Sequence, residues 1–245
     1  MSSIPPFGSA RGTASGTSPR PGSLASAATA LNQGPGPRTE RLTRLKSRTP
    51  RPGEASFFYF DAHFKSEAVK ILPGEYFVYH EDLLIMTTLG SCIAVCLWDR
   101  QAKVGGMNHF MLPDSGGNGQ DSGRYGSYAM ELLINELMKL GASRMTMEAK
   151  VFGGGAVISG MNTINVGERN TTFVMDYLKT ERIPVVSKDV LDIYPRKVCF
   201  LPHSGKAMVK RLAPSNPEAL VAQERAALQK SSPATATGGG SVDLF

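Results

Sequence analysis

Cysteine is scarce in this chain, and long apolar runs are missing from it. Only three cysteines, Cys92, Cys96 and Cys199, occur among 245 residues, and an odd, small number excludes a disulfide framework. A reducing, cytoplasmic compartment fits this composition and keeps a thiol available for chemistry. No stretch approaches the roughly 18 consecutive apolar residues of a membrane span, so we expect no membrane insertion. Hydrophobic residues still make up 41% of the chain, enough for a buried core.

Acidic residues are almost missing from the start of the chain. The whole chain has a formal charge of +6, which taken alone suggests nucleic-acid binding. Residues 1–52 hold eight Lys or Arg against one acid, Glu40, a charge of +7 that leaves −1 for the rest. We therefore expect no nucleic-acid partner for the body. Residues 1–53 lack apolar periodicity, which predicts a disordered basic tail, although an Arg- and Ser-rich start is also typical of organelle transit peptides.

The composition predicts one ordered body, 54–212, followed by a flexible tail, 213–245, in which 214–230 has the residues of a short helix. Within the body, apolar patterns and Gly or Pro breakers predict strands over 83–86, 93–98, 104–112, 145–152, 183–190 and 197–201. Helices are expected over 125–140 and 168–178, and a loop over 113–123. The strands and helices do not alternate strictly, which favours an α+β layered fold with mixed sheets.

The most informative segment is the strand that runs into Gly90-Ser91-Cys92. Glycine permits a sharp turn, and such a turn can expose a thiol while it directs backbone N–H groups at the same point. Those groups would stabilise the oxyanion formed when a thiolate attacks a carbonyl. A cysteine in a strand is more often a small buried hydrophobe, which is our interpretation of Cys96 and Cys199. The glycine turn favours a nucleophile at Cys92.

His109 is the natural base for such a nucleophile. A turn at Asp99-Arg100-Gln101 predicts a hairpin that folds the strand of His109 back beside the strand of Cys92. A histidine near a cysteine lowers the thiol pKa, although spacing alone leaves room for a buried core histidine. A third group usually orients the base. The nearby candidates are Asp99, Asn108, Asp114, Thr87 and Thr88.

Other motifs are weaker. Gly153-Gly154-Gly155 follows a strand, but it matches no nucleotide-binding pattern and is typical of a tight loop that allows close packing. The spacing from Cys92 to Cys96 fits neither a zinc site nor a Cys-x-x-Cys redox pair. Arg169 and Asn170 open a helix, where they either cap it or line a substrate groove.

Four segments together resemble the chemoreceptor glutamine deamidases called CheD: LGSCIAVCL (89–97), GGMNHFMLP (105–113), KVFGGGA (150–156) and VGERN (166–170). The resemblance implies a layered α/β sandwich similar to deamidating toxin domains. It implies hydrolysis of glutamine side chains in methyl-accepting chemotaxis receptors, with Cys92 as nucleophile and His109 as base. It also implies a threonine upstream of the cysteine as third group; Thr87 and the adjacent Thr88 both fit, and we choose Thr87. It implies no metal and no cofactor.

The sequence departs from this family late in the chain, where Leu191-Asp192-Ile193-Tyr194 stands in the place of a Gly-Gly pair. The departure bears on a partner contact more than on the chemistry. Two other interpretations remain. One is a non-catalytic docking module for chemotaxis receptors or for a phosphatase partner. The other is a thiol redox protein that uses Cys92 and Cys96.

Overall fold

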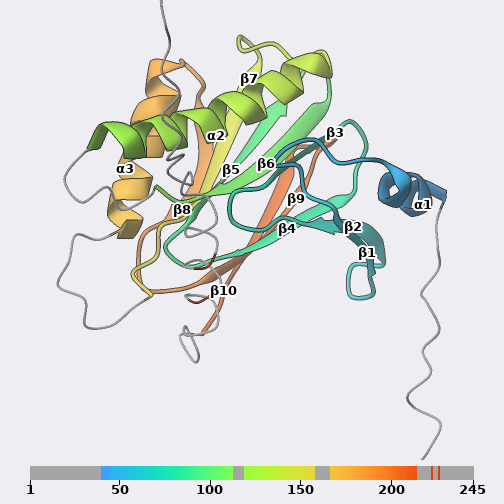
Figure 1. Ribbon diagram of the computed structural model, residues 1–245, viewed down its shortest axis with the longest axis horizontal. Coiled ribbons are helices and arrows are strands. Elements are labelled where there is room, and N and C mark those ends of the chain that lie inside the picture. The colour runs from blue at the N-terminus through green and yellow to red at the C-terminus, as the bar shows by residue number, and fades with distance from the viewer. Residues whose placement is uncertain (1–39, 113–118, 158–165, 214–221, 223–225, 227–245) are drawn as a thin grey trace, which may run out of the picture. The chain divides into compact units, whose positions relative to one another are not determined.

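The computed structural model describes residues 40–112, 119–157 and 166–213, together with residues 222 and 226. Figure 1 shows the order of its elements. The helices are α1 (Glu40–Ser47), α2 (Gly119–Lys139) and α3 (Val166–Thr180). The strands are β1 (Phe57–Asp61), β2 (Ser66–Lys70), β3 (Tyr76–Tyr79), β4 (Leu84–Leu89), β5 (Ile93–Asp99), β6 (Val104–Phe110), β7 (Met147–Gly153), β8 (Val185–Val190), β9 (Arg196–Leu201) and β10 (Lys206–Arg211).

The strands form two five-stranded mixed sheets. The first sheet has the order β3-β6-β5-β7-β8, and the second has the order β1-β2-β4-β9-β10. Most neighbouring strands are antiparallel, whereas β7 with β8 and β2 with β4 are parallel. Helices α2 and α3 pack against the first sheet, as Figure 1 shows. The predicted α+β layered class is therefore confirmed.

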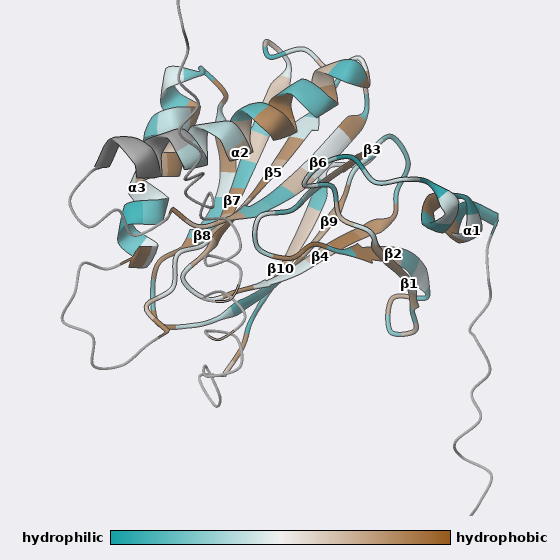
Figure 2. Cartoon of the chain, in the orientation of Figure 1, coloured by the Kyte–Doolittle hydropathy of each residue, from teal (hydrophilic) through white to brown (hydrophobic). Residues whose placement is uncertain are grey.

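Side-chain alternation along β5 divides the apolar core into two parts. Ile93, Val95 and Leu97 belong to the cluster shared with α2 and α3. Ala94 and Cys96 point the opposite way, into the cluster shared with the second sheet, because successive side chains of a strand leave opposite faces. Figure 2 shows hydrophobic and hydrophilic residues alternating around α2, as expected of a helix with one face on a sheet.

The predicted hairpin is present, and its turn is well anchored. Strands β5 and β6 pair antiparallel, and Lys103 N–H donates to the carbonyl of Asp99 at 2.9 Å. The Asp99 carboxylate accepts from the N–H groups of Gln101 and Ala102 at 2.8 and 3.0 Å. The predicted loop over 113–123 is wrong at its end, because α2 already begins at Gly119. Strands β1, β2, β3 and β10 were not predicted.

The predicted disordered tail over 1–53 is wrong for residues 40–53. Helix α1 buries Leu42 and Leu45 in the core between the sheets. Arg41 forms an ion pair with Glu67, and Arg48 pairs with the buried Glu54 at 2.6 Å. An amphipathic helix of this length gains its stability from such packing, so the described body begins at Glu40.

Residues 1–39 lie outside the described residues. So does the predicted helix over 214–230, apart from two isolated positions. None of the described helices combines the length and apolar character needed to cross a membrane.

Candidate active site

The turn that holds Cys92 lies where the chain passes from one sheet to the other. Residues 90–92 join β4 of the second sheet to β5 of the first. Cys92 is fully buried. Its carbonyl accepts from Gly154 N–H at 2.8 Å, and the Gly90 carbonyl accepts from Gly155 N–H at the same distance. The glycine loop after β7 therefore fixes the backbone on both sides of Ser91.

This loop depends on the absence of side chains. Gly153 has a φ of +113°, and a Cβ atom there would lie 2.1 Å from the Cys92 carbonyl oxygen. A Cβ atom on Gly154 would lie 2.3 Å from Oγ1 of Thr171 in α3. The sequence-based interpretation of Gly153-Gly154-Gly155 as a close-packing loop is confirmed.

Asn170 ties the turn to the far end of β6. Its Nδ2 donates to the Ser91 carbonyl at 2.8 Å, and its Oδ1 accepts from Leu112 N–H at 3.0 Å. The side chain is fully buried, and Arg169 adds a bond from Nη2 to the Leu112 carbonyl at 3.1 Å. Asn170 thus holds together the two segments that carry Cys92 and His109. The sequence contains no signal for this role, because both partners are far away along the chain.

The side chain of His109 leaves the first sheet on the face that points toward the second sheet, and Cys92 is buried in the core on that face. His109 is directly opposite Ala94 across the β5–β6 pair, so both side chains point toward the second sheet. Its backbone is held as well: the His109 N–H donates to the Glu75 carbonyl at 2.9 Å, and its carbonyl accepts from Gly74 N–H at 2.7 Å. The hairpin thus brings His109 and Cys92 to the same end of the inter-sheet core.

Thr87 reaches His109 from the other sheet. Its Oγ1 lies 2.8 Å from Nδ1 of His109 and 2.9 Å from the carbonyl oxygen of Ile71. Leu84 and Met86 point to the opposite face of β4, and by the same alternation so does Thr88. Of the two candidate threonines, the structure therefore brings Thr87 to the histidine.

These contacts assign the protons. A threonine hydroxyl has one proton, and Thr87 donates it to the carbonyl of Ile71. The Nδ1 of His109 therefore carries the hydrogen and donates it to Thr87 Oγ1. The neutral imidazole then has its lone pair on Nε2, an atom that is buried without a hydrogen-bond partner among the described residues.

Burial keeps His109 neutral. Desolvation lowers its pKa to about 3, against a smaller opposing effect of the Ile71 carbonyl. A neutral imidazole is a proton acceptor at pH 7, and it is not the resident cation that would hold a thiolate ready. The neutral state of His109 is therefore compatible with its expected role as base.

Two of the remaining candidates, Asp99 and Asn108, have structural roles. Asp99 accepts from Ser143 N–H and Thr146 Oγ1 at 2.7 and 2.6 Å. Asn108 points to α2, where its Nδ2 donates to the Ala129 carbonyl at 3.2 Å. Asp114 lies outside the described residues. Burial strongly raises the pKa of the Cys96 thiol, as expected for packing.

No disulfide joins the three cysteines, all of which are buried. Within the described ranges, no three His, Cys, Asp or Glu side chains gather as a metal site requires.

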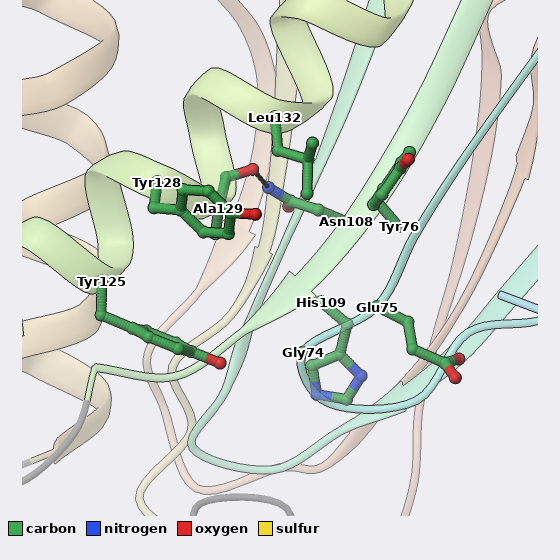
Figure 3. Close-up of a pocket in the computed structure, with 9 residues that line it drawn as sticks. All are labelled: Gly74, Glu75, Tyr76, Asn108, His109, Tyr125, Tyr128, Ala129 and Leu132. Atoms are coloured by element: carbon green, nitrogen blue, oxygen red, sulfur yellow. Dashed lines mark hydrogen bonds between the residues drawn. The ribbon is translucent and has the colours of Figure 1, made fainter. Parts of the chain in front are cut away.

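A pocket of about 170 Å³ adjoins His109 (Figure 3). It is lined by residues 74–76, by Asn108 and His109 of β6, and by Tyr125, Tyr128, Ala129 and Leu132 of α2. Neither Cys92 nor Thr87 lines it. The pocket therefore adjoins the base but not the thiol or the threonine.

The segment that departs from the Gly-Gly pattern keeps a backbone suited to glycine. Leu191 and Asp192 have φ values of 63° and 66°, in the left-handed region that favours glycine. The fully buried Arg196 holds this turn by donating to the Leu191 carbonyl at 2.7 Å and to Asp189 at 2.9 Å. Leu191 N–H donates to the Gly153 carbonyl at 2.9 Å, so the turn packs on the glycine loop.

Comparisons with known proteins give a consistent result. The family model described as "CheD chemotactic sensory transduction" matches residues 111–211. A protein of Albidiferax ferrireducens named "Probable chemoreceptor glutamine deamidase CheD 1" is 65% identical over 205 residues, which is 84% of this chain and 87% of that protein. A protein of the same name from Dechloromonas aromatica is 57% identical over 168 residues, 68% of this chain and 84% of its own.

Among solved structures, the hypothetical protein YfiH of Bacillus licheniformis has a TM-score of 0.35 and 10% identity, over 48% of this chain and 51% of that one. A likeness this low carries no argument, and the expected similarity to deamidating toxins stays a prediction.

Proposed function

The chain belongs to the CheD family, and from this premise we propose that it is a protein-glutamine deamidase that hydrolyses glutamine side chains of methyl-accepting chemotaxis receptors. The names of its close relatives support the reaction and the kind of substrate. We also propose a cytoplasmic location, because three cysteines without a disulfide fit a reducing compartment.

The contact between Thr87 and His109 carries the proposed chemistry. It leaves the lone pair of His109 on Nε2. The His109 side chain and Cys92 both lie on the face of the first sheet that points toward the second. A base in this tautomer, oriented by a third group, is what activation of a thiol nucleophile requires. We propose Cys92 as nucleophile, His109 as general base and Thr87 as the group that orients it.

In the proposed first step, Nε2 of His109 removes the thiol proton while Cys92 Sγ attacks the carboxamide carbon of glutamine. The carbonyl oxygen becomes an oxyanion, which backbone N–H groups of the 90–92 turn stabilise. The protonated His109 then gives its proton to the nitrogen, the C–N bond breaks, and ammonia leaves.

A thioester between Cys92 and the substrate remains. Water attacks it while His109 accepts a proton from that water. The C–S bond breaks, the thiol recovers its proton, and a glutamate side chain is released.

The test is mass spectrometry of a soluble receptor fragment, combined with measurement of ammonia release. We expect the wild-type protein to convert glutamines to glutamates, and Cys92→Ala and His109→Ala to lose at least about a thousandfold in rate while they stay folded. Cys96→Ala is the matched cysteine control and should keep most of the activity.

Each alternative has its own outcome. Tight binding of the fragment without ammonia release would favour the docking module. Loss of activity in a folded Cys96→Ala protein would favour the redox pair.

A further inference from the structure

The pocket beside His109 has a definite place relative to the proposed reaction. The reacting carbonyl carbon must lie within about 3.5 Å of the nucleophile. Cys92 does not line the pocket, whereas His109 does. The pocket therefore adjoins the proposed base without including the nucleophile, so it can hold a part of the substrate other than the reacting carboxamide.

The walls of the pocket are held by hydrogen bonds made before any substrate binds. Tyr76 pairs with Asn108 across β3 and β6, and Gly74 and Glu75 bond to the backbone of His109 at 2.7 and 2.9 Å. Asn108 also bonds to the Ala129 carbonyl at 3.2 Å and thereby connects the sheet to α2. A pocket with walls of this kind keeps its shape, which lowers the entropic cost of filling it.

Two polar residues of the pocket, Asn108 and Glu75, already have hydrogen-bond partners. Asn108 Oδ1 accepts from Val95 N–H at 3.1 Å, and its Nδ2 donates to Ala129. The Glu75 carboxylate accepts from Leu72 N–H at 2.8 Å, and Figure 3 shows it pointing away from α2. Burial raises the pKa of Glu75.

Two lining residues have a buried polar atom without a partner in the described part of the chain: the hydroxyl of Tyr76 and Nε2 of His109. Tyr125 and Tyr128 also line the pocket and carry hydroxyls, whereas Ala129 and Leu132 give it an apolar wall (Figure 3). An apolar group loses no hydrogen bonds here, and it gains contact with Leu132, Ala129 and the tyrosine rings.

We infer that this pocket binds an aliphatic side chain of the substrate, from a residue close in sequence to the target glutamine. The inference rests on the proposed function and names a specificity determinant for it. The volume of about 170 Å³ accommodates one side chain of the size of leucine. The substrate segment lies across His109, with the glutamine at Cys92 and the aliphatic side chain between Tyr125 and Tyr76.

The test uses glycine-rich peptides with one glutamine, in which leucine replaces glycine in turn at each of the four positions on either side. The corresponding glutamate peptides cannot react, so calorimetry on them measures binding alone. We expect one leucine position to bind about tenfold more tightly than the all-glycine peptide, because burying a leucine side chain is favourable by at least that factor.

Ala129→Leu fills the pocket and should remove this preference. Asn135→Leu adds the same side chain at an exposed position of α2 and should leave it intact. The inference is overturned if no leucine position binds better than glycine, or if the preference survives in Ala129→Leu. A preference that is present while no glutamine peptide releases ammonia would contradict the proposed deamidation and leave the pocket assignment standing.

Discussion

The hydroxyl of Thr87 lies 2.8 Å from Nδ1 of His109, although the two residues belong to different sheets. The contact connects β4 to β6 beside the apolar cluster between the two sheets. It also decides which nitrogen of the imidazole has the lone pair. Orientation of the base and packing of the two sheets are thus linked at one hydrogen bond.

Replacing Thr87 by valine should lower kcat by about ten- to hundredfold, because one buried hydrogen bond contributes about 1–3 kcal/mol. Thr87→Ser keeps the hydroxyl and should restore most of the rate. Nitrogen NMR of His109 should show the tautomer with hydrogen on Nδ1 in the wild-type protein and a mixture in Thr87→Val. Thr88→Val, on the opposite face of β4, is the control. An unchanged tautomer and rate in Thr87→Val would refute the assignment.

Asn170→Asp should lower kcat with little change in KM, because the carboxylate can still accept from Leu112 N–H but cannot donate to the Ser91 carbonyl. The rate of Cys92 alkylation should fall in parallel, since the turn that positions the thiol loses an anchor. Asn135→Ala, which truncates an exposed asparagine of α2, should change neither quantity. A loss of stability with normal kcat in the folded protein would reduce Asn170 to a packing role.

Folding stability should depend on pH through His109. The folded-state pKa is about 3 and the unfolded-state value is 6.5, so between these values the unfolded chain binds a proton that the folded protein does not. Stability is complete above pH 6.5 and falls as the pH decreases, by up to about 1.4 kcal/mol per pH unit from this group.

His109→Gln provides the comparison, because carboxylates such as Asp99 and Asp189 also have lowered pKa values and lose their contribution at low pH. The difference in unfolding midpoint between wild type and variant should shrink as the pH decreases from 7 to 4.5. A constant difference would mean that His109 is not buried as a neutral group.

Two truncations separate the N-terminal tail from the body. Removing residues 1–39 should leave the melting temperature nearly unchanged. Removing 1–53 also deletes Leu42 and Leu45, which are buried, and each such side chain contributes about 1.5–3 kcal/mol. The longer truncation should therefore lower the melting temperature by many degrees. Equal melting temperatures would show that α1 does not stabilise the body.

The sequence is informative where structure depends on near neighbours. The β5–β6 hairpin follows from a turn at Asp99-Arg100-Gln101 between two apolar runs, and it places His109 beside the strand of Cys92. Helix α1 was not predicted, because its apolar stripe consists of only two leucines among charged residues. Its stability comes from a core formed by segments much later in the chain.

The choice between Thr87 and Thr88 could not be made from the sequence. It depends on which face of β4 meets the first sheet, and a shift of one residue reverses that face. The role of Asn170 could not be predicted either, because its partners, Ser91 and Leu112, lie 79 and 58 residues away along the chain. The packing role of the glycine loop was predictable because the loop matches no nucleotide-binding motif.

The chain crosses from one sheet to the other at residues 90–92, so the proposed catalytic residues are divided between the two sheets. Cys92 lies directly before β5, which pairs with the strand of His109 in one sheet, whereas Thr87 lies on β4 of the other. Sliding of one sheet past the other would therefore leave the nucleophile and the base in register and separate the base from its orienting hydroxyl.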